Sequence, residues 1–172
     1  TLGKYFGGGL SFGAFGGRKD VMQRFDPRRA DALGHAGTFN NNVLTMAAGL
    51  AGLTQVLTPQ ALEALNQRGE RLRERLNGVF ARHGIGMQFT GLGSVMKLQP
   101  LAGPLRSADD LAGADDRFKA LVFFDLLEHG IFLARRGLVT LSLPFGETQA
   151  DAFVTAMDAV VAHRRALLPP AN

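Results

Sequence analysis

The chain opens with TLGKYFGGGLSFGAFGGR, residues 1–18, in which a single lysine, Lys4, lies among apolar residues and glycines. A lysine in apolar surroundings is costly to desolvate unless it is paired, neutral or covalently used. Desolvation also favours the neutral amine, which is the form that attacks a carbonyl carbon. Glycines let the backbone and a ligand approach each other closely. The segment therefore predicts a reactive amine in a crowded, shaped site.

The composition indicates a globular protein that can bury a sizeable core. The chain has 172 residues, enough for one or two small domains. Hydrophobic residues make up 46% and charged residues 20%, which excludes a disordered chain. The absence of cysteine excludes disulfides and cysteine metal sites, and it favours a reducing, cytoplasmic setting. The most apolar stretch, 43–57, is too short to span a bilayer, so we expect a buried helix and no membrane partner.

The net charge of +4 makes nucleic acid a partner to consider. The basic residues are scattered among acidic ones, as between Arg68 and Arg75, and one tyrosine with no tryptophan offers little for base stacking. This mixture is typical of a solvated helix face, so we expect no nucleic-acid partner. The first residue is Thr rather than Met, within the glycine-rich motif, and we expect a piece of a longer protein.

The first half of the chain predicts one short strand and two helices. Residues 10–15 are apolar and bounded by glycine, which indicates a buried strand. One or two helical turns over 18–25 and a loop over 26–37 follow. Asn40 to Asn42 offer caps for a helix over 43–57, and its small residues allow close packing on a neighbour. Thr58-Pro59 is a strong start signal for a long helix that ends near His83.

The second half predicts an α+β unit. Short strands are expected at 87–90, 94–98, 131–133 and 138–143, with a loop over 100–113. An amphipathic helix is expected over 115–129 and a last helix from Thr148, which buries Phe153, Met157, Val160 and Val161. Asp125 and Glu128 are expected to face solvent.

Two familiar glycine motifs fail around Lys4. A P-loop places its glycines before the lysine and Ser or Thr after it, whereas here the glycines follow and Tyr5 comes next. No three glycines of the run have the G-x-G-x-x-G spacing of a dinucleotide site. Spacing alone leaves two interpretations of Lys4: a Schiff-base lysine, or a simple surface lysine near a terminus.

The residues around Lys4 resemble the cofactor-lysine region of class III aminotransferases, which are pyridoxal-phosphate enzymes of fold type I. The likeness extends through His35-Ala36-Gly37-Thr38-Phe39 and on to the last helix. It is strongest toward the branch that holds glutamate-1-semialdehyde aminomutase and the β-amino-acid aminotransferases. It implies a partial α/β fold: the end of the large cofactor domain (1–57), a connecting helix (58–84) and a small α+β C-terminal domain (85–172).

The resemblance also implies roles for particular residues. Lys4 would form the Schiff base with pyridoxal 5′-phosphate and then move a proton between the substrate carbon and the cofactor. Thr38, with room made by Gly37, would bind the cofactor phosphate of a partner subunit, so that a homodimer shares its sites. Without the resemblance, Thr38 is a turn or cap hydroxyl.

Two adjacent arginines lie between the apolar stretches of 131–133 and 138–143. Adjacent strand residues face opposite ways, so only one is expected to enter a site. The resemblance favours Arg135 over Arg136 as the guanidinium that binds a substrate carboxylate, although a solvent-facing turn is the default. For His35 a catalytic role is one alternative, and a loop residue near a dimer interface is the favoured interpretation. The four histidines show no metal-ligand spacing.

Three functions follow from these observations. The first is transfer of an amino group between an amino acid, with β-amino acids among the candidates, and a keto acid. The second is the aminomutase reaction, which moves an amine within one substrate. The third is a non-catalytic fragment, because the resemblance places most of the cofactor's other contacts upstream of Lys4.

Overall fold

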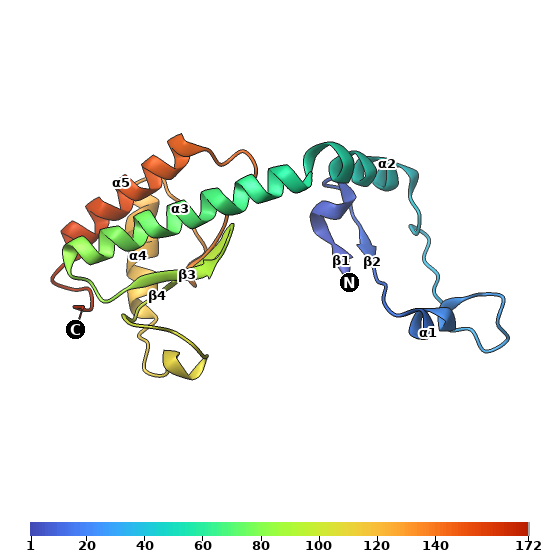
Figure 1. The fold of residues 1–172 in the computed structure, drawn as a ribbon, viewed down its shortest axis with the longest axis horizontal. Coiled ribbons are helices and arrows are strands. Elements are labelled where there is room, and N and C mark those ends of the chain that lie inside the picture. Colours follow the sequence, from blue (N-terminus) through green and yellow to red (C-terminus); the bar gives the residue numbers. More distant parts are fainter. Residues whose placement is uncertain (172) are drawn as a thin grey trace. The chain divides into compact units, whose positions relative to one another are not determined.

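The computed structural model describes residues 1–171, and of Tyr5 the backbone alone. The chain forms two compact units, Thr1–Ala61 and a second that begins at Leu62 and contains the rest (Figure 1). The division into 1–57, 58–84 and 85–172 remains a prediction. No helix among residues 1–171 is both long and apolar enough to cross a bilayer.

The first unit is built from short elements. Strand β1 (Leu2–Gly3) pairs antiparallel with β2 (Gly13–Ala14), and the 3-10 helix η1 (Lys4–Gly7) lies between them in sequence. Helix α1 (Lys19–Met22) continues into the 3-10 turn η2 (Gln23–Phe25). Helix α2 (Val43–Ala51) continues into the π-helical turn η3 (Gly52–Val56), which confirms the helix expected over 43–57. The Asn42 side chain accepts a hydrogen bond from the Thr45 backbone N–H (3.1 Å), as the predicted cap requires.

Two expectations for the first unit are wrong. Only Gly13–Ala14 of the expected strand 10–15 is a strand, and Leu10 and Phe15 are exposed rather than buried. The helix of 43–57 is not buried either, since Val43 is 77% exposed. In both cases the described elements leave much of the side chain exposed; Phe15 contacts the rings of Phe25 and His35 and is still 40% exposed. The buried hydrophobic residues of the described chain run from Leu65 to Leu168, all of them in the second unit.

The second unit packs helices on a three-stranded antiparallel sheet. Its long helix α3 (Pro59–His83) starts where predicted, with the Thr58 hydroxyl accepting from the Ala61 N–H at 3.2 Å. Strands β3 (Gln88–Leu92), β4 (Val95–Gln99) and β5 (Leu138–Thr140) follow in the sheet order β3-β4-β5. The short 3-10 turn η4 (Asp109–Leu111) lies in the expected loop.

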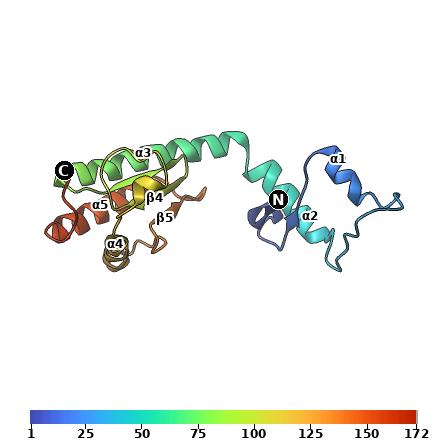
Figure 2. The same ribbon diagram turned by 90° about the horizontal axis from the view of Figure 1, so that it is seen from below.

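Helices α4 (Arg117–Glu128) and α5 (Glu147–Arg164) complete this unit. α4 runs across the direction of α3 and is seen nearly end-on in Figure 2. The predicted inward residues of α5 (Phe153, Met157, Val160 and Val161) are all buried. The expected strand 131–133 does not form, because the backbone there has no strand partner.

Side chains of α3 hold the β3–β4 hairpin in place. The Asn77 amide donates to the Phe89 carbonyl (3.0 Å) and accepts from the Phe89 N–H (2.7 Å). At the turn, Glu70 accepts from the Gly93 N–H (2.6 Å) and Asn66 from the Ser94 N–H (3.1 Å). The edge strand and the hairpin turn are therefore hydrogen-bonded to the helix as well as packed on it.

Helices α3 and α5 run side by side in the same direction (Figure 1). Ion pairs join successive turns of the two helices: Arg71 with Glu147 (3.4 Å), Arg75 with Asp151 (2.7 Å) and Arg82 with Asp158 (2.9 Å). The residue numbers rise together along both helices, which is what a parallel pair requires.

Candidate functional site

Lys4 occupies a strained position at the start of η1. Its φ is +58°, in the left-handed region that residues with a side chain rarely adopt. Such a conformation costs about 1–3 kcal/mol and persists only where the surrounding structure imposes it. The side chain is exposed, and among the described residues its ammonium has no hydrogen-bond or ion-pair partner. The backbone of Lys4 is thus strained, and the expected crowding around its amine stays a prediction.

Close packing of η1 on α2 imposes this backbone path. A Cβ on Gly49 would lie 2.5 Å from the Phe6 carbonyl oxygen, and a Cβ on Gly8 would overlap the Ala48 carbonyl. A Cβ on Gly7 would lie 2.6 Å from Phe12 Cβ. The glycines thus let the segment after Lys4 lie directly on the helix, which confirms the prediction that the small residues of α2 pack closely on a neighbour.

Gly37 and Thr38 lie in a turn that leads into α2. The Asn40 N–H donates to the Gly37 carbonyl (3.0 Å), and a Cβ on Gly37 would lie 2.9 Å from Asn40 Oδ1. The turn thus leaves little space for a side chain at position 37. Thr38 is exposed, and its hydroxyl has no hydrogen-bond partner in the part of the chain that the structure describes. Its hydroxyl is free to bind a ligand.

His35 belongs to an aromatic cluster of the first unit. Its ring lies edge-on to Phe15, with centroids 4.9 Å apart, and 6.4 Å from Phe25. Phe15 and Phe25 also contact each other at 5.0 Å. These contacts give His35 a packing role in the loop.

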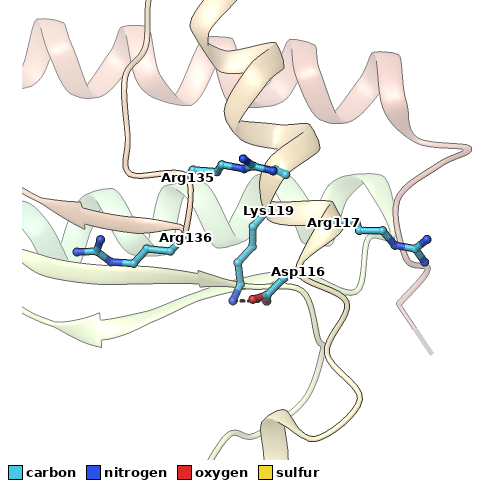
Figure 3. A pocket seen from close by; sticks show the side chains of 6 residues that line it. Asp116, Arg117, Lys119, Arg135 and Arg136 are labelled. Atoms are coloured by element: carbon cyan, nitrogen blue, oxygen red, sulfur yellow. Dashed lines mark ion pairs between the residues drawn. The ribbon is translucent and has the colours of Figure 1, made fainter.

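Arg135 and Arg136 occupy a tight turn in the second unit. The Gly137 N–H donates to the Ala134 carbonyl (2.7 Å), and Gly137 has a φ of +85°. The Leu98 N–H donates to the Gly137 carbonyl (2.9 Å), which ties the turn to β4. The strand argument for choosing between the arginines does not apply, because neither is in a strand. The two side chains nevertheless leave the turn in opposite directions (Figure 3).

Arg135 lies against an aromatic ring. Its Cζ is 5.6 Å from the centroid of Phe124, close enough for a cation–π contact. Both arginines line one cavity of about 590 Å³ beside the first turn of α4. The other residues that line it are Asp116, Arg117, Lys119 and Ala120 (Figure 3). The cavity is rich in positive charge, as a site for a carboxylate would be.

Lys119 is a residue of this cavity that sequence reasoning missed. It is only 5% exposed, and its ammonium lies 2.8 Å from the Asp116 carboxylate. The helical spacing could have indicated its burial, because Lys119 lies three residues before Val122 and seven before Leu126, which are both buried. A lysine on the apolar face of a helix is costly to bury without a partner.

The chemistry of the first unit fits an aldehyde that carries a phosphate. Lys4 offers an unpartnered primary amine, which is the nucleophile for an aldehyde carbon. The Thr38 hydroxyl is a donor suited to a phosphate oxygen. Arg135 lies in the second unit, as do the other residues of the basic cavity. Among residues 1–171, no group of three or more His, Asp or Glu side chains could hold a metal ion.

Comparison with known proteins shows which family the chain matches. The model of the aminotransferase class-III family matches residues 1–157. The chain is 55% identical over all its 172 residues to a beta-phenylalanine transaminase from Variovorax paradoxus, of which it spans 39%. It is 31% identical over 161 residues, 92% of the chain, to a glutamate-1-semialdehyde 2,1-aminomutase from Limosilactobacillus reuteri, of which it spans 37%.

Solved structures give the same result. The crystal structure of the Variovorax paradoxus beta-phenylalanine aminotransferase superposes with a TM-score of 0.92 at 54% identity, over 99% of this chain and 40% of that one. An omega-transaminase from Sphaerobacter thermophilus superposes with a TM-score of 0.82 at 34% identity, over 95% of this chain and 38% of that one. The chain thus spans about two fifths of the relatives that it matches.

Proposed function

The chain belongs to the class-III aminotransferase family, and we propose that it works within a longer pyridoxal-phosphate-dependent aminotransferase. Its fold is the corresponding part of a fold type I enzyme. The proposed reaction moves an amino group from an amino acid to a keto acid. The observation that carries this proposal is Lys4, a residue of the family match with a strained backbone, glycine packing next to it and an amine without a partner among the described residues.

The Lys4 amine has two tasks in this proposal. Its amine would hold the cofactor through the aldehyde carbon. When free, the amine would take a proton from the substrate carbon that bears the amino group and deliver it to the cofactor, so that the amino group can leave the substrate. Bound pyridoxal phosphate supplies the electron sink for this proton transfer. The left-handed backbone of Lys4 fixes where the side chain begins, which limits the positions from which the amine can act.

Thr38 and the Gly37–Asn40 turn hold the cofactor phosphate in the proposal. The hydroxyl and the neighbouring backbone N–H groups are phosphate donors. We place this phosphate in the site of a partner subunit, so that the enzyme is a homodimer with shared sites. The exposed apolar side chains of the first unit are consistent with burial in such an assembly. We also propose that the enzyme is cytoplasmic.

Arg135 binds the carboxylate of the substrate in this proposal. A guanidinium can hold a carboxylate through two parallel hydrogen bonds, and Arg135 has no acidic partner among the described residues. The relative at 55% identity is named for beta-phenylalanine, so a β-amino acid is the proposed amino donor. Two aminomutase relatives, from Limosilactobacillus reuteri and Bacillus pumilus, are 31% and 35% identical to the chain, which favours the transaminase over the aminomutase.

The test uses the enzyme that contains this chain, loaded with pyridoxal phosphate. Borohydride reduction followed by peptide mass mapping should place the cofactor on Lys4, and Lys4→Ala should abolish both the adduct and transamination of β-phenylalanine with a keto acid. Lys19→Ala is the matched control, because Lys19 is also an exposed lysine of the first unit. An adduct at another lysine, or full activity of Lys4→Ala, would refute the proposal. Activity on glutamate-1-semialdehyde alone would identify the aminomutase.

A further inference from the structure

The basic cavity beside α4 holds more positive charge than one substrate carboxylate needs. Four cationic side chains and one carboxylate line its 590 Å³. Arg117 is already neutralised, because it makes hydrogen bonds of 2.6–3.0 Å to Asp115. Arg135 is the residue proposed above for the substrate carboxylate. Lys119 is paired with the carboxylate that lines the same cavity, Asp116, and Arg136 has no ion-pair partner among the described residues, so neither has an assigned ligand.

Lys119 is oriented toward an anion. Its side chain is 7% exposed, yet its ammonium reaches Asp116, whose side chain is 79% exposed. The two groups meet at 2.8 Å, a normal distance for a charge-assisted hydrogen bond (Figure 3). An ammonium has three donors, and Asp116 is the one partner that the described residues give it. The Lys119 ammonium is thus paired with a carboxylate that also lines the cavity.

Arg136 lines the same cavity from a tight turn, and its guanidinium points away from Lys119 and Asp116 in Figure 3. The turn is fixed by the Gly137 hydrogen bonds to Ala134 and Leu98, whereas the Arg136 side chain is exposed and has no ion-pair partner among residues 1–171. Such a side chain can swing toward an anion without breaking an existing contact. Its departure from the turn opposite to Arg135 keeps the two guanidinium groups apart (Figure 3).

We propose that Lys119 and Arg136 form an oxyanion subsite separate from Arg135, in which Asp116 occupies the ammonium until a ligand replaces it. The ligand is a carboxylate or phosphate group. It can be the second anionic group of a substrate whose first carboxylate binds Arg135, or a free anion. The substrate alternative rests on the proposed aminotransferase function, whereas the free-anion alternative does not.

The subsite predicts opposite effects of two kinds of substitution. Arg136→Gln and Lys119→Met remove donors, so each should weaken anion binding about tenfold, in line with one charge-assisted hydrogen bond. Asp116→Asn removes the competing carboxylate and should strengthen binding about threefold or more. Arg117→Gln is the matched control, since it changes a cation of the same cavity that Asp115 already neutralises, and it should change binding less than about twofold.

The experiment measures these variants in the complete enzyme. Calorimetric titration with inorganic phosphate measures the affinity of the subsite for a free anion. The ratio of KM for a keto acid with two carboxylates to KM for a keto acid with one measures whether the subsite binds the second carboxylate of a substrate. Effects on phosphate alone identify a free-anion site, and a KM change confined to the two-carboxylate acid identifies the substrate group. Either result supports the subsite.

Two outcomes would overturn it. One is that neither the phosphate affinity nor the KM ratio changes by more than about twofold in Arg136→Gln and Lys119→Met, which is the effect expected for a screened surface charge. The other is that Arg117→Gln weakens anion binding as much as Arg136→Gln does, which would indicate a nonspecific electrostatic effect of the net positive charge rather than a binding site. If the wild-type enzyme transfers no amino group, the proposed function fails, and the phosphate titration still decides on the subsite.

Discussion

Arg164 of α5 donates two hydrogen bonds to Asp125 of α4, from Nε to Oδ2 at 2.6 Å and from Nη2 to Oδ1 at 3.0 Å. Asp125 is 8% exposed, so the expectation that it faces solvent is wrong. It lies on the same helix face as the buried Val122 and Leu126, and Arg164 supplies the charge that makes its burial tolerable. The pair joins two helices that cover the sheet of the second unit.

Removal of the arginine should destabilise the second unit. Arg164→Met leaves the Asp125 carboxylate largely buried without its partner, and the free energy of unfolding should fall by about 1–3 kcal/mol. Chemical denaturation followed by circular dichroism measures the change. Arg165→Met is the control, because Arg165 is exposed and has no partner among the described residues. Equal loss in both variants would contradict the assigned role of the pair.

The same pair predicts how stability depends on pH. Arg164 lowers the pKa of Asp125 through its hydrogen bonds to the carboxylate. A lowered folded-state pKa means that the contribution is complete above the unfolded pKa of about 3.9 and is lost as the pH falls through the folded value. The difference in unfolding free energy between wild type and Asp125→Asn should therefore be constant from about pH 7 to pH 5 and shrink below about pH 4. A difference that grows on acidification would exclude this linkage.

Neighbouring residues of α3 should differ sharply in their effect. Leu76 is fully buried, and Leu76→Ala should lower the free energy of unfolding by about 2–5 kcal/mol through lost burial and a cavity. Arg75 pairs with Asp151 at 2.7 Å on the surface, and Arg75→Gln should cost less than about 1 kcal/mol, with a smaller effect in high salt. Denaturation curves of the two variants at low and high salt check both statements. A loss for Arg75→Gln as large as for Leu76→Ala would mean that the ion pairs, rather than the core, hold α3.

Two glycines of the α2–η3 helix test how the Lys4 segment is held. Gly49→Ala improves helix propensity by about 1 kcal/mol, yet its Cβ would lie 2.5 Å from the Phe6 carbonyl oxygen. Gly52→Ala meets its nearest neighbour, Gly8 Cα, at an ordinary 3.7 Å. In the complete enzyme, Gly49→Ala should reduce cofactor trapping on Lys4 and Gly52→Ala should not, as measured by borohydride reduction and mass mapping. If the Gly49→Ala enzyme traps the cofactor on Lys4 as well as wild type does, the close contact with the Phe6 carbonyl does not control the position of Lys4.

The sequence predicted the positions of helices and strands better than it predicted which side chains are buried. Periodic apolar residues and the Thr58-Pro59 start signal located α3 and α5, because these signals are local. Exposure of α2 and burial of Asp125 depend on what lies opposite each residue, and a local pattern does not contain that information. The segment 131–133 is apolar, like a strand, but a strand also needs a partner edge, which the described chain does not provide. Lys119 was not singled out for the related reason that the burial of a charged side chain also depends on what lies opposite it.

The isolated 172-residue chain should bind pyridoxal phosphate weakly. Lys4 is exposed and Thr38 has no polar partner among the described residues, so these two groups would have to overcome the entropy of ordering the ligand. The first unit also exposes the large apolar side chains of Val43, Leu44 and Leu50, and the buried hydrophobic side chains that the structure describes all lie in the second unit, away from the Lys4 segment. Titration with pyridoxal phosphate, followed by absorbance, should show no saturation below about 1 mM, which corresponds to roughly 4 kcal/mol of binding free energy. The Lys4→Ala chain serves as the control for reaction at other lysines. Tight, saturable binding that Lys4→Ala abolishes would show instead that this chain carries enough of the site to hold the cofactor by itself.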